Sequence, residues 1–299
     1  MQEQLSFDAL MPPEMAGKAE NVGVNKTKLN SFRMFALAVL AGAFIAMGAI
    51  FSTTATTGGS ALPFGVTKVL GGITFSLGLI LVVIAGAELF TGNNLIVMAW
   101  ASHKVSTGQL IRNWIIVYLG NFVGSILTAY MMFLSKQYEF SNGALGLNAL
   151  TIANNKTGLD FIPALVLGIF CNALVCLAVW LCMSARTTTD RVLAIVPPIT
   201  AFVAAGFEHS IANMYFIPVG LFIKSGADGA FWTNIGKTAA DFSNLTWGNF
   251  FLANLLPVTI GNIIGGAVMV GLVYWSIYLR KTATVTAQPP QMKPAEHRP

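Results

Sequence analysis

Charged residues are scarce in this sequence. Asp, Glu, Lys and Arg make up only 10% of its 299 residues, whereas soluble domains carry about 25%. Hydrophobic residues make up 55%, and the mean hydropathy is +0.68. Because so few charges cannot cover a water-exposed surface, the composition excludes an ordinary soluble domain and predicts an integral membrane protein.

Cysteine and histidine are also scarce, with three residues of each. Cys171, Cys176 and Cys182 fall in one apolar segment and lack the spacing of metal ligands. We expect them to be small packing residues. The sequence offers no cluster of histidines or cysteines that could supply a catalytic metal or nucleophile. We therefore expect no metal, no cofactor and no enzymatic activity.

A cleavable signal peptide is missing from the first thirty residues, which mix acids and bases and contain Pro12 and Pro13. Residues 7–24 instead suggest a short amphipathic helix on the membrane surface or against a neighbouring subunit. We divide the chain into a cytoplasmic N-terminal segment (1–30), a transmembrane channel domain (31–281) and a cytoplasmic tail (282–299). The tail is rich in Thr, Gln and Pro, and we expect it to be disordered.

The sequence does contain a series of apolar segments, each near the length of about 20 residues that a helix needs to cross a bilayer. The second segment runs on past residues 91–94, and the fifth is interrupted at residues 208–213. Non-helical backbone survives at membrane depth only where it is buried in protein or lines a wet cavity. We therefore predict an all-α protein with six transmembrane helices, of which the second and fifth are broken at a pathway. The segments are residues 34–56, 69–90, 112–134, 160–184, 192–223 and 250–279.

The distribution of basic residues predicts the orientation. With both termini on one side, that side holds 12 of the 17 Lys and Arg residues and the opposite side holds 5. The positive-inside rule makes the first side cytoplasmic. The same bias accounts for the net charge of +5, so no nucleic-acid partner is expected.

An internal repeat divides the transmembrane domain into two halves. A Glu-x4-Asn pattern occurs at residues 88–93 and 208–213, and a Gly-Asn-x-x-Gly pattern at residues 120–124 and 261–265. Each half would hold three crossings, and an odd number forces the two repeats into opposite orientations. Inverted repeats with broken helices are a recurring plan of transporters and channels. The repeated glycines suit close packing between helices.

Glu88 and Glu208 are acidic residues that lie well inside the apolar segments, where an ionisable group suggests a function. Each is followed by an asparagine, Asn93 or Asn213. Because both halves keep the pair, we favour structural support, in which these side chains hold the backbone that each helix break leaves free. A direct role in a proton relay is the alternative.

His209 has no counterpart in the first half, where Leu89 takes its position. The symmetry of the repeat does not require a histidine there, so we predict a role in a pore. Imidazole can exchange a proton near neutral pH. Burial disfavours its charged form and an ionised Glu208 nearby favours it, and the sequence does not rank the two effects. Thr91 at the first break and Asn172 in the fourth segment are further polar candidates for the pathway.

Several other residues are weaker candidates. Lys156, expected in a loop on the non-cytoplasmic side, could attract anions toward a pore mouth, and a solvated loop lysine is the alternative. Phe75, Leu79 and Phe202 flank the breaks and could narrow a pore, although packing against lipid or core is the usual role of such residues.

The two breaks also carry a family resemblance. The runs GAELFTGN (residues 86–93) and GFEHSIANM (residues 206–214), together with Gly120-Asn121 and Asn172, closely resemble the formate/nitrite transporter family. The long N-terminal segment, with the run FDALMPPEMAGKAENVGV (residues 7–24), resembles the formate-channel branch more than the shorter nitrite channels. The resemblance extends from about residue 7 to residue 281. Neither break contains Asn-Pro-Ala, so the water-channel family is disfavoured.

The resemblance implies an aquaporin-like protomer, assembled as a homopentamer in a bacterial inner membrane, with one pore in each protomer. It also implies a formate-producing cytoplasmic enzyme as a partner of the N-terminal segment. It places Thr91, Asn172 and His209 in a central chamber. The residues that it assigns to constrictions are Phe75, Leu79, Phe202 and Leu89, and those that it places near the mouth are Lys156 and Asn262.

These observations lead to the hypothesis of bidirectional passage of a small monovalent anion, best fitted by formate. An anion pays a steep desolvation cost in an apolar constriction, and protonation by His209 would let it cross as the neutral acid. The first alternative is a nitrite or hydrosulfide channel of the same architecture, which a comparison of fluxes would separate. The second is a membrane enzyme that uses His209 as a general base, which flux without chemical change would exclude.

Overall fold

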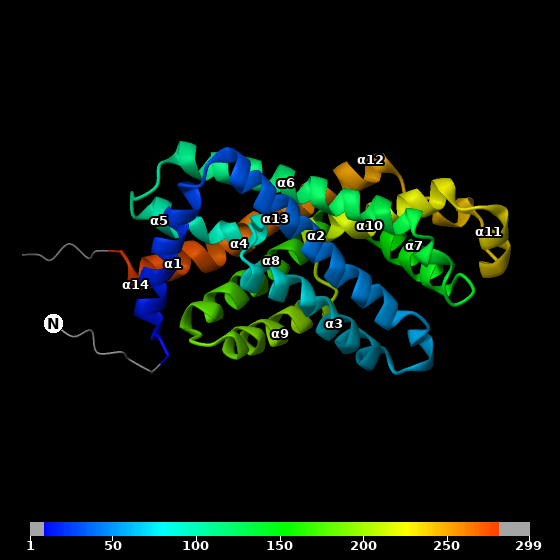
Figure 1. Cartoon of the computed structure of the whole chain (residues 1–299), viewed down its shortest axis with the longest axis horizontal. Coiled ribbons are helices and arrows are strands. Elements are labelled where there is room, and N and C mark those ends of the chain that lie inside the picture. Colours follow the sequence, from blue (N-terminus) through cyan, green and yellow to red (C-terminus); the bar gives the residue numbers. More distant parts are fainter. Residues whose placement is uncertain (1–8, 281–299) are drawn as a thin grey trace, which may run out of the picture.

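The computed structural model describes residues 9–280, and all the regular structure in that range is helical (Figure 1). Short 3-10 turns connect several helices, and π-helical turns interrupt the last long one at Phe250–Leu255 and Ile264–Leu272. The α-helices are α1 (Pro12–Thr27), α2 (Ser31–Thr56), α3 (Phe64–Ala85), α4 (Phe90–Asn93), α5 (Val97–Ala101), α6 (Thr107–Leu134), α7 (Ala144–Thr157), α8 (Phe161–Ser184), α9 (Thr188–Ala204), α10 (Ser210–Gly226), α11 (Gly229–Ile235), α12 (Trp247–Asn249), α13 (Leu256–Ile263) and α14 (Val273–Tyr278).

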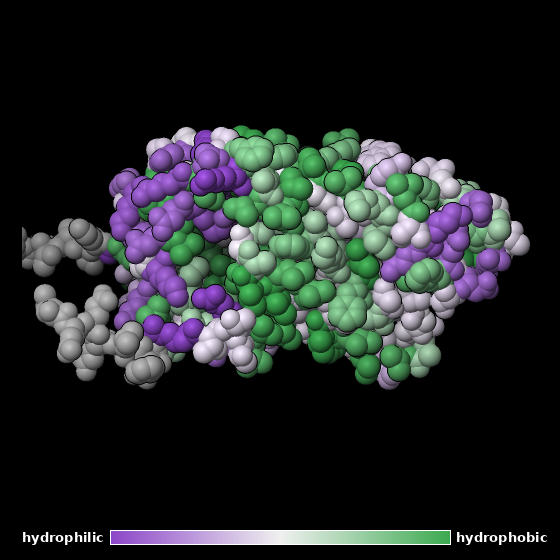
Figure 2. Space-filling model, in the orientation of Figure 1, coloured by the Kyte–Doolittle hydropathy of each residue, from purple (hydrophilic) through white to green (hydrophobic). Residues whose placement is uncertain are grey.

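A hydrophobic band crosses the middle of the molecule between two hydrophilic ends (Figure 2). Five helical stretches of the described chain are long and apolar enough to span a membrane, namely α2, α3, α6, α8 and the stretch Ala239–Tyr278, whose long helical part begins at Trp247. Large side chains such as Leu119 on α6 and Leu252 in the last stretch are more than half exposed, as expected for a surface that faces lipid rather than water. The prediction of an all-α integral membrane protein is confirmed.

The second and fifth apolar segments are both interrupted, but each break lies a few residues earlier than predicted. Residues 91–93 and 210–213, expected at the interruptions, belong to α4 and α10. The first break separates α3 from α4, and the second separates α9 from α10. At each break a glycine adopts positive φ, 82° at Gly86 and 74° at Gly206. A residue in this left-handed region ends an α-helix, and glycine adopts it without steric cost. The fifth apolar segment therefore consists of two helices of 17 residues each, which meet inside the protein.

Glycines bring the long helices into close contact. Gly124 of α6 lies against the carbonyl oxygen of Val39 in α2, and Gly265, directly after α13, lies against the carbonyl oxygen of Ile169 in α8. A Cβ at either glycine would collide with the neighbouring backbone, so no other residue fits without moving a helix. The expectation that the repeated glycines serve helix packing is confirmed.

Two helices differ from the expected layout. The helix α1 begins later than the predicted residues 7–24 and is held by Lys18, whose Nζ donates to the Met183 carbonyl oxygen at the end of α8 (2.8 Å). Lys156, predicted in a loop, lies in the last turn of α7. The helix α7 is too short and too polar to resemble a membrane crossing, so hydropathy alone misses it.

The predicted disordered tail (282–299) and residues 7 and 8 of the predicted first helix lie outside the described residues.

The glycine contacts generate a stability prediction. Gly124→Ala should lower the midpoint of thermal unfolding of the detergent-solubilised protein, because overpacking a tight contact costs about 1–3 kcal/mol. Gly17→Ala in α1 is the matched control, since nothing lies within 4 Å of a Cβ at that position. A midpoint in Gly124→Ala equal to that of Gly17→Ala would show that the α2–α6 contact can open without cost.

Candidate functional site

The two helix breaks meet through Thr91 and His209. Thr91 Oγ1 lies 3.0 Å from His209 Nε2, although the residues are 118 positions apart in the sequence. Both side chains are buried. The structure therefore brings together the two polar residues that were predicted separately, one at each break.

The ring of His209 is held in a defined orientation. His209 is the N-cap of α10, and its Nδ1 accepts a hydrogen bond from the backbone N–H of Ala212 (3.0 Å). An accepting Nδ1 carries no proton, so the neutral ring carries its proton on Nε2 and donates it to Thr91 Oγ1. A second proton on Nδ1 would face the Ala212 N–H and abolish the cap. The fold therefore favours a neutral histidine that presents an N–H to the junction of the two breaks.

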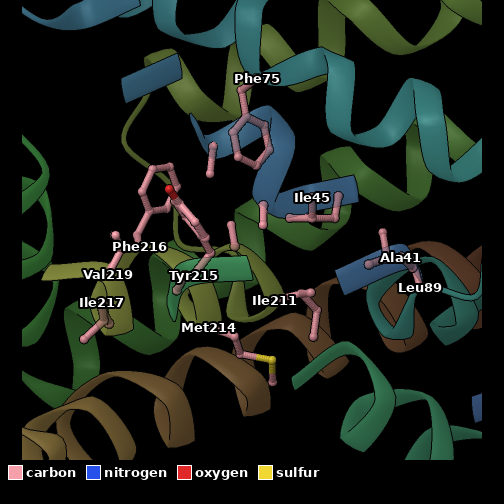
Figure 3. Packing of buried hydrophobic residues seen from close by; sticks show 14 of the residues in the cluster. Ala41, Ile45, Phe75, Leu89, Ile211, Met214, Tyr215, Phe216, Ile217 and Val219 are labelled. Carbon is pink, nitrogen blue, oxygen red and sulfur yellow. The ribbon is translucent and has the colours of Figure 1, made fainter. Parts of the chain in front are cut away.

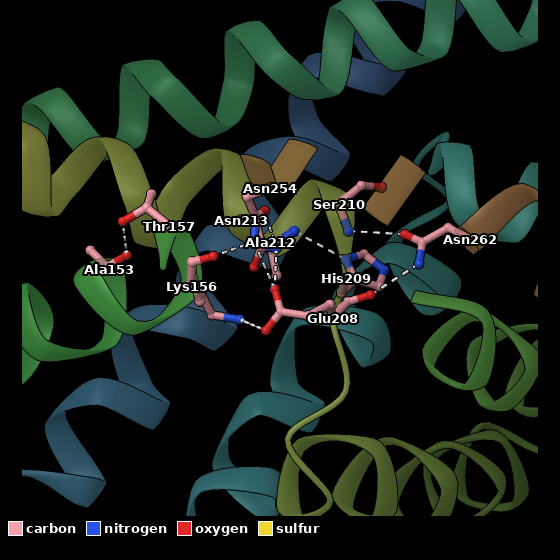
Figure 4. Close-up of polar contacts among 10 residues, drawn as sticks. All are labelled: Ala153, Lys156, Thr157, Glu208, His209, Ser210, Ala212, Asn213, Asn254 and Asn262. Atoms are coloured by element: carbon pink, nitrogen blue, oxygen red, sulfur yellow. Dashed lines mark hydrogen bonds and ion pairs between the residues drawn. The ribbon is translucent and has the colours of Figure 1, made fainter. Parts of the chain in front are cut away.

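The carboxylate of Glu208 is turned away from this junction. Its Oε1 accepts from Lys156 Nζ (2.8 Å), and its Oε2 accepts from Asn213 Nδ2 (2.6 Å) and Asn254 Nδ2 (3.2 Å). Figure 4 shows the carboxylate and the His209 ring pointing in different directions. With a lysine and two amides around it, the buried charge is both neutralised and hydrogen-bonded.

Glu88 has an equivalent set of partners. Its Oε1 accepts from Lys26 Nζ (2.7 Å), its Oε2 accepts from Asn93 Nδ2 (2.7 Å), and Asn93 donates in turn to Asn113 Oδ1 (3.0 Å). Each half thus contains a lysine, a glutamate and two asparagines, although Asn254 also donates to Glu208 whereas Asn113 donates to Met34 Sδ (3.7 Å). In the described residues both carboxylates bind side chains and form buried ion pairs, and the choice between structural support and a proton relay stays a prediction.

Sequence reasoning missed the lysine of the first half, although a signal was present. The triplet Asn-Lys-Thr occurs at residues 25–27 and again at residues 155–157, at the ends of α1 and α7. The repeat therefore begins at α1, well before the first long apolar segment. A search for repeats confined to the apolar segments could not find it.

The backbone at each break is held by Asn121 and Asn262. The Oδ1 of Asn121 accepts from the N–H of Phe90 (2.9 Å), and the Oδ1 of Asn262 accepts from the N–H of Ser210 (2.9 Å). Their Nδ2 groups donate to the carbonyl oxygens of Glu88 and Glu208. These amides, and not the Glu-Asn pairs, satisfy the free main-chain groups. Asn262, which the resemblance places near the pore mouth, is fully buried and engaged with backbone.

A cavity of about 690 Å³ reaches His209 from the side of α7 and the α2–α3 connection. Lys68, Lys156 and several hydroxyl and amide side chains line it. At its inner end the rings of Phe75 and Phe202 pack edge to face with centroids 5.7 Å apart, and Phe202 stacks on the His209 ring at 6.0 Å.

The other predicted constriction residues, Leu79 and Leu89, are each only 2% exposed and belong to the hydrophobic core. Phe75 also stacks on Phe216, with ring centroids 6.2 Å apart; Figure 3 shows both rings and Leu89. Aromatic side chains thus line the polar cavity next to His209, which is itself part of the cavity wall.

Asn172 is fully buried beside the first break. Its Nδ2 donates to the carbonyl oxygens of Asn262 (2.6 Å) and Thr91 (3.3 Å). The structure therefore places Asn172 next to Thr91, as predicted, with its amide N–H groups directed at main-chain oxygens.

Comparisons with known proteins agree with this architecture. The model of the formate/nitrite transporter family matches residues 13–276. Formate channel FocA of Escherichia coli (strain K12) is 51% identical over 275 residues, which cover 92% of this chain and 96% of the relative. Formate channel FocA of Haemophilus influenzae is 42% identical over 280 residues, with coverage of 94% and 98%. A solved structure described as "Pentameric formate channel with formate bound" has a TM-score of 0.80 at 48% identity and covers 84% of this chain and 98% of its own.

The buried ion pair generates a prediction. Glu208→Gln should destabilise the protein by about 3–5 kcal/mol, because it leaves the Lys156 charge buried without a counter-charge. The double variant Glu208→Gln with Lys156→Met should recover part of this loss. Thermal or denaturant unfolding in detergent would measure the coupling.

The exposed pair of Lys237 and Asp241, at 46% and 40% side-chain exposure, provides the matched control. Lys237→Met should change stability by less than about 1 kcal/mol. Strictly additive effects of the Glu208 and Lys156 substitutions would contradict a structural coupling between them.

Proposed function

The chain belongs to the formate/nitrite transporter family, and on this basis we propose that it is a membrane channel that passes formate in both directions. The observation that carries the proposal is the contact between Thr91 and His209, where the two helix breaks meet behind a polar cavity. Because similar proteins are named as formate channels, we propose formate rather than another small anion as the substrate.

The proposed architecture is an aquaporin-like protomer with six crossings in two inverted repeats. The matching networks around Glu88 and Glu208 support a repeat, and α9 with α10 would supply the fifth, broken crossing. The solved structure of a pentameric formate channel supports a homopentamer. The excess of basic residues on one side supports cytoplasmic termini in a bacterial inner membrane. A formate-producing cytoplasmic enzyme would then meet the protein at α1.

In the proposed mechanism an anion first enters the polar cavity, where Lys68 and Lys156 attract it. It then meets the rings of Phe75 and Phe202, which provide no hydrogen bonds to replace its hydration shell. Behind them the Nε2–H of His209 is the donor that faces the pathway. An anion would compete with Thr91 for this N–H.

The protonated ring would transfer its Nε2 proton to a formate oxygen, which gives formic acid and a neutral histidine that keeps its proton on Nδ1 until the Nε2 proton returns. Formic acid crosses the apolar region without the cost of burying a charge, and the proton returns to His209 afterwards. Loading the ring with its second proton breaks the Nδ1 cap to Ala212. We therefore expect the population of the doubly protonated His209 ring to increase as the pH falls, so that formate flux rises toward acidic pH.

A nitrite or hydrosulfide channel of the same architecture is the alternative, since donors placed for one small anion serve others. Formate and nitrite flux through the purified protein in proteoliposomes should differ in favour of formate. Equal rates would favour a general channel for small anions. Recovery of chemically unchanged substrate would exclude an enzyme.

The role of His209 is tested by His209→Phe in proteoliposomes. The variant keeps an aromatic ring against Phe202 and loses both nitrogens, so formate flux should lose its dependence on pH. His103→Asn is the control, because it removes an exposed histidine at a positive φ of 59° that asparagine tolerates. An unaltered pH dependence in His209→Phe would remove His209 from the mechanism.

A further inference from the structure

The two halves of the fold hold the same main-chain oxygen by different side chains. Three residues after Glu88 lies Thr91, and three residues after Glu208 lies Ile211. The Thr91 carbonyl oxygen accepts from Asn172 Nδ2 (3.3 Å), whereas Ser125 Oγ lies 3.5 Å from the Ile211 carbonyl oxygen and shares its one proton between that oxygen and the Gly42 carbonyl oxygen (3.2 Å). Asn172 belongs to α8 and Ser125 to α6, so the support comes from a different helix of each half.

The repeat itself shows how the two supports are related. Asn121 Nδ2 donates to the Ala38 carbonyl oxygen and Asn262 Nδ2 donates to the Gly168 carbonyl oxygen, so Ala38 and Gly168 are equivalent and Asn172 corresponds to Gly42. Asn121 and Asn262 are equivalent, so Ser125 corresponds to Gly266. Each half therefore pairs one polar residue with one small residue. The polar residue lies on α6 in one half and on α8 in the other. The pairs are Gly42 with Ser125 in one half and Asn172 with Gly266 in the other.

A steric reason explains the glycine. A Cβ at Gly266 would collide with the Asn172 Nδ2 and would lie 2.8 Å from the Cys176 Sγ. The side chain of Asn172 thus occupies the space that a side chain at position 266 would need. Gly266 also lies in the π-helical stretch Ile264–Leu272, directly after Asn262, whose carbonyl oxygen accepts the second Asn172 hydrogen bond (2.6 Å).

Thr91, whose carbonyl oxygen accepts from Asn172, is also the residue that contacts His209. The Thr91 carbonyl oxygen also accepts a weaker bond from Cys176 Sγ (3.3 Å), one turn after Asn172. While its backbone is held from α8 in this way, the Thr91 hydroxyl lies 3.0 Å from His209 Nε2. A shift of this backbone would move the hydroxyl with it, because threonine has few side-chain rotamers.

We propose that Asn172 is a positioning residue which, with Gly266 as its steric partner, fixes the Thr91 backbone and thereby the contact between Thr91 and His209. Both N–H groups of its amide are engaged with main-chain oxygens, so Asn172 does not donate to the transported anion. The inference rests on the proposed function for its flux readout and on the hydrogen bonds alone for its stability readout.

The test transfers the arrangement of the first half to the second. Asn172→Ala removes the support of Thr91, and Gly266→Ser creates the collision, so each should lower formate flux by about tenfold or more, as expected for losing a buried hydrogen bond. The double variant Asn172→Ala with Gly266→Ser approximates the pair of Gly42 and Ser125, with a small residue at position 172 and a hydroxyl at position 266. It should recover much of the flux and of the thermal stability of the purified protein.

A second cycle distinguishes positioning from direct contact. If Asn172 acts through Thr91, formate flux through the double variant Asn172→Ala with Thr91→Ala should be no lower than flux through Thr91→Ala alone. The dependence of flux on pH in Asn172→Ala should then match the altered dependence in Thr91→Ala. This cycle decides the question even if Gly266→Ser fails to fold.

Two results would overturn the proposal. One is that Gly266→Ser gives no recovery in the Asn172→Ala background, in either flux or unfolding midpoint. The other is that Asn172→Ala and Thr91→Ala lower flux independently, with a raised half-saturating formate concentration in Asn172→Ala only, which would indicate direct contact with the anion. A wild-type protein that passes no formate would refute the proposed function instead, and the unfolding midpoints would still test the exchange of the pair.

Discussion

Main-chain groups freed inside a membrane impose the central constraint on this structure. Hydrocarbon offers no hydrogen-bond partners, and each unsatisfied N–H or C=O costs several kcal/mol. Both helix breaks expose such groups, and Asn121 and Asn262 satisfy them with an oxygen and a nitrogen from the same amide. The protein can therefore place two non-helical segments at its centre. The rest of the helix packing keeps these two amides in position.

Around this framework the charges are arranged in matching sets. Glu88 with Lys26 and Glu208 with Lys156 form buried ion pairs, completed by asparagines. Because the sets match, they account for the stability of the breaks and do not by themselves distinguish one half from the other. We propose that the differences between the halves carry the functional chemistry. His209 stands where the first half has Leu89.

Asn172 is a second residue at which the two halves differ. The main-chain oxygen that it supports is also supported in the other half, but the polar side chain there comes from Ser125 on another helix. An asparagine reaches further than a serine, and it needs the space that Gly266 leaves. The scaffold thus tolerates a change of supporting residue as long as the total volume and the hydrogen bond are kept.

The sequence by itself determined the membrane environment and the interruption of the second and fifth apolar segments, and it named Thr91 and His209 as candidates, because hydropathy acts locally along the chain. The breaks lie a few residues earlier than predicted, since α4 and α10 already begin at Phe90 and Ser210. The sequence did not reveal that Lys26 belongs to Glu88, that α7 is a helix, or that Asn121 and Asn262 hold the backbone. Those facts depend on contacts between residues tens of positions apart. The Nε2 tautomer of His209 was also decided only by tertiary structure, since it follows from the place of the ring at the start of α10 and from the Thr91 hydroxyl that the other break brings to it.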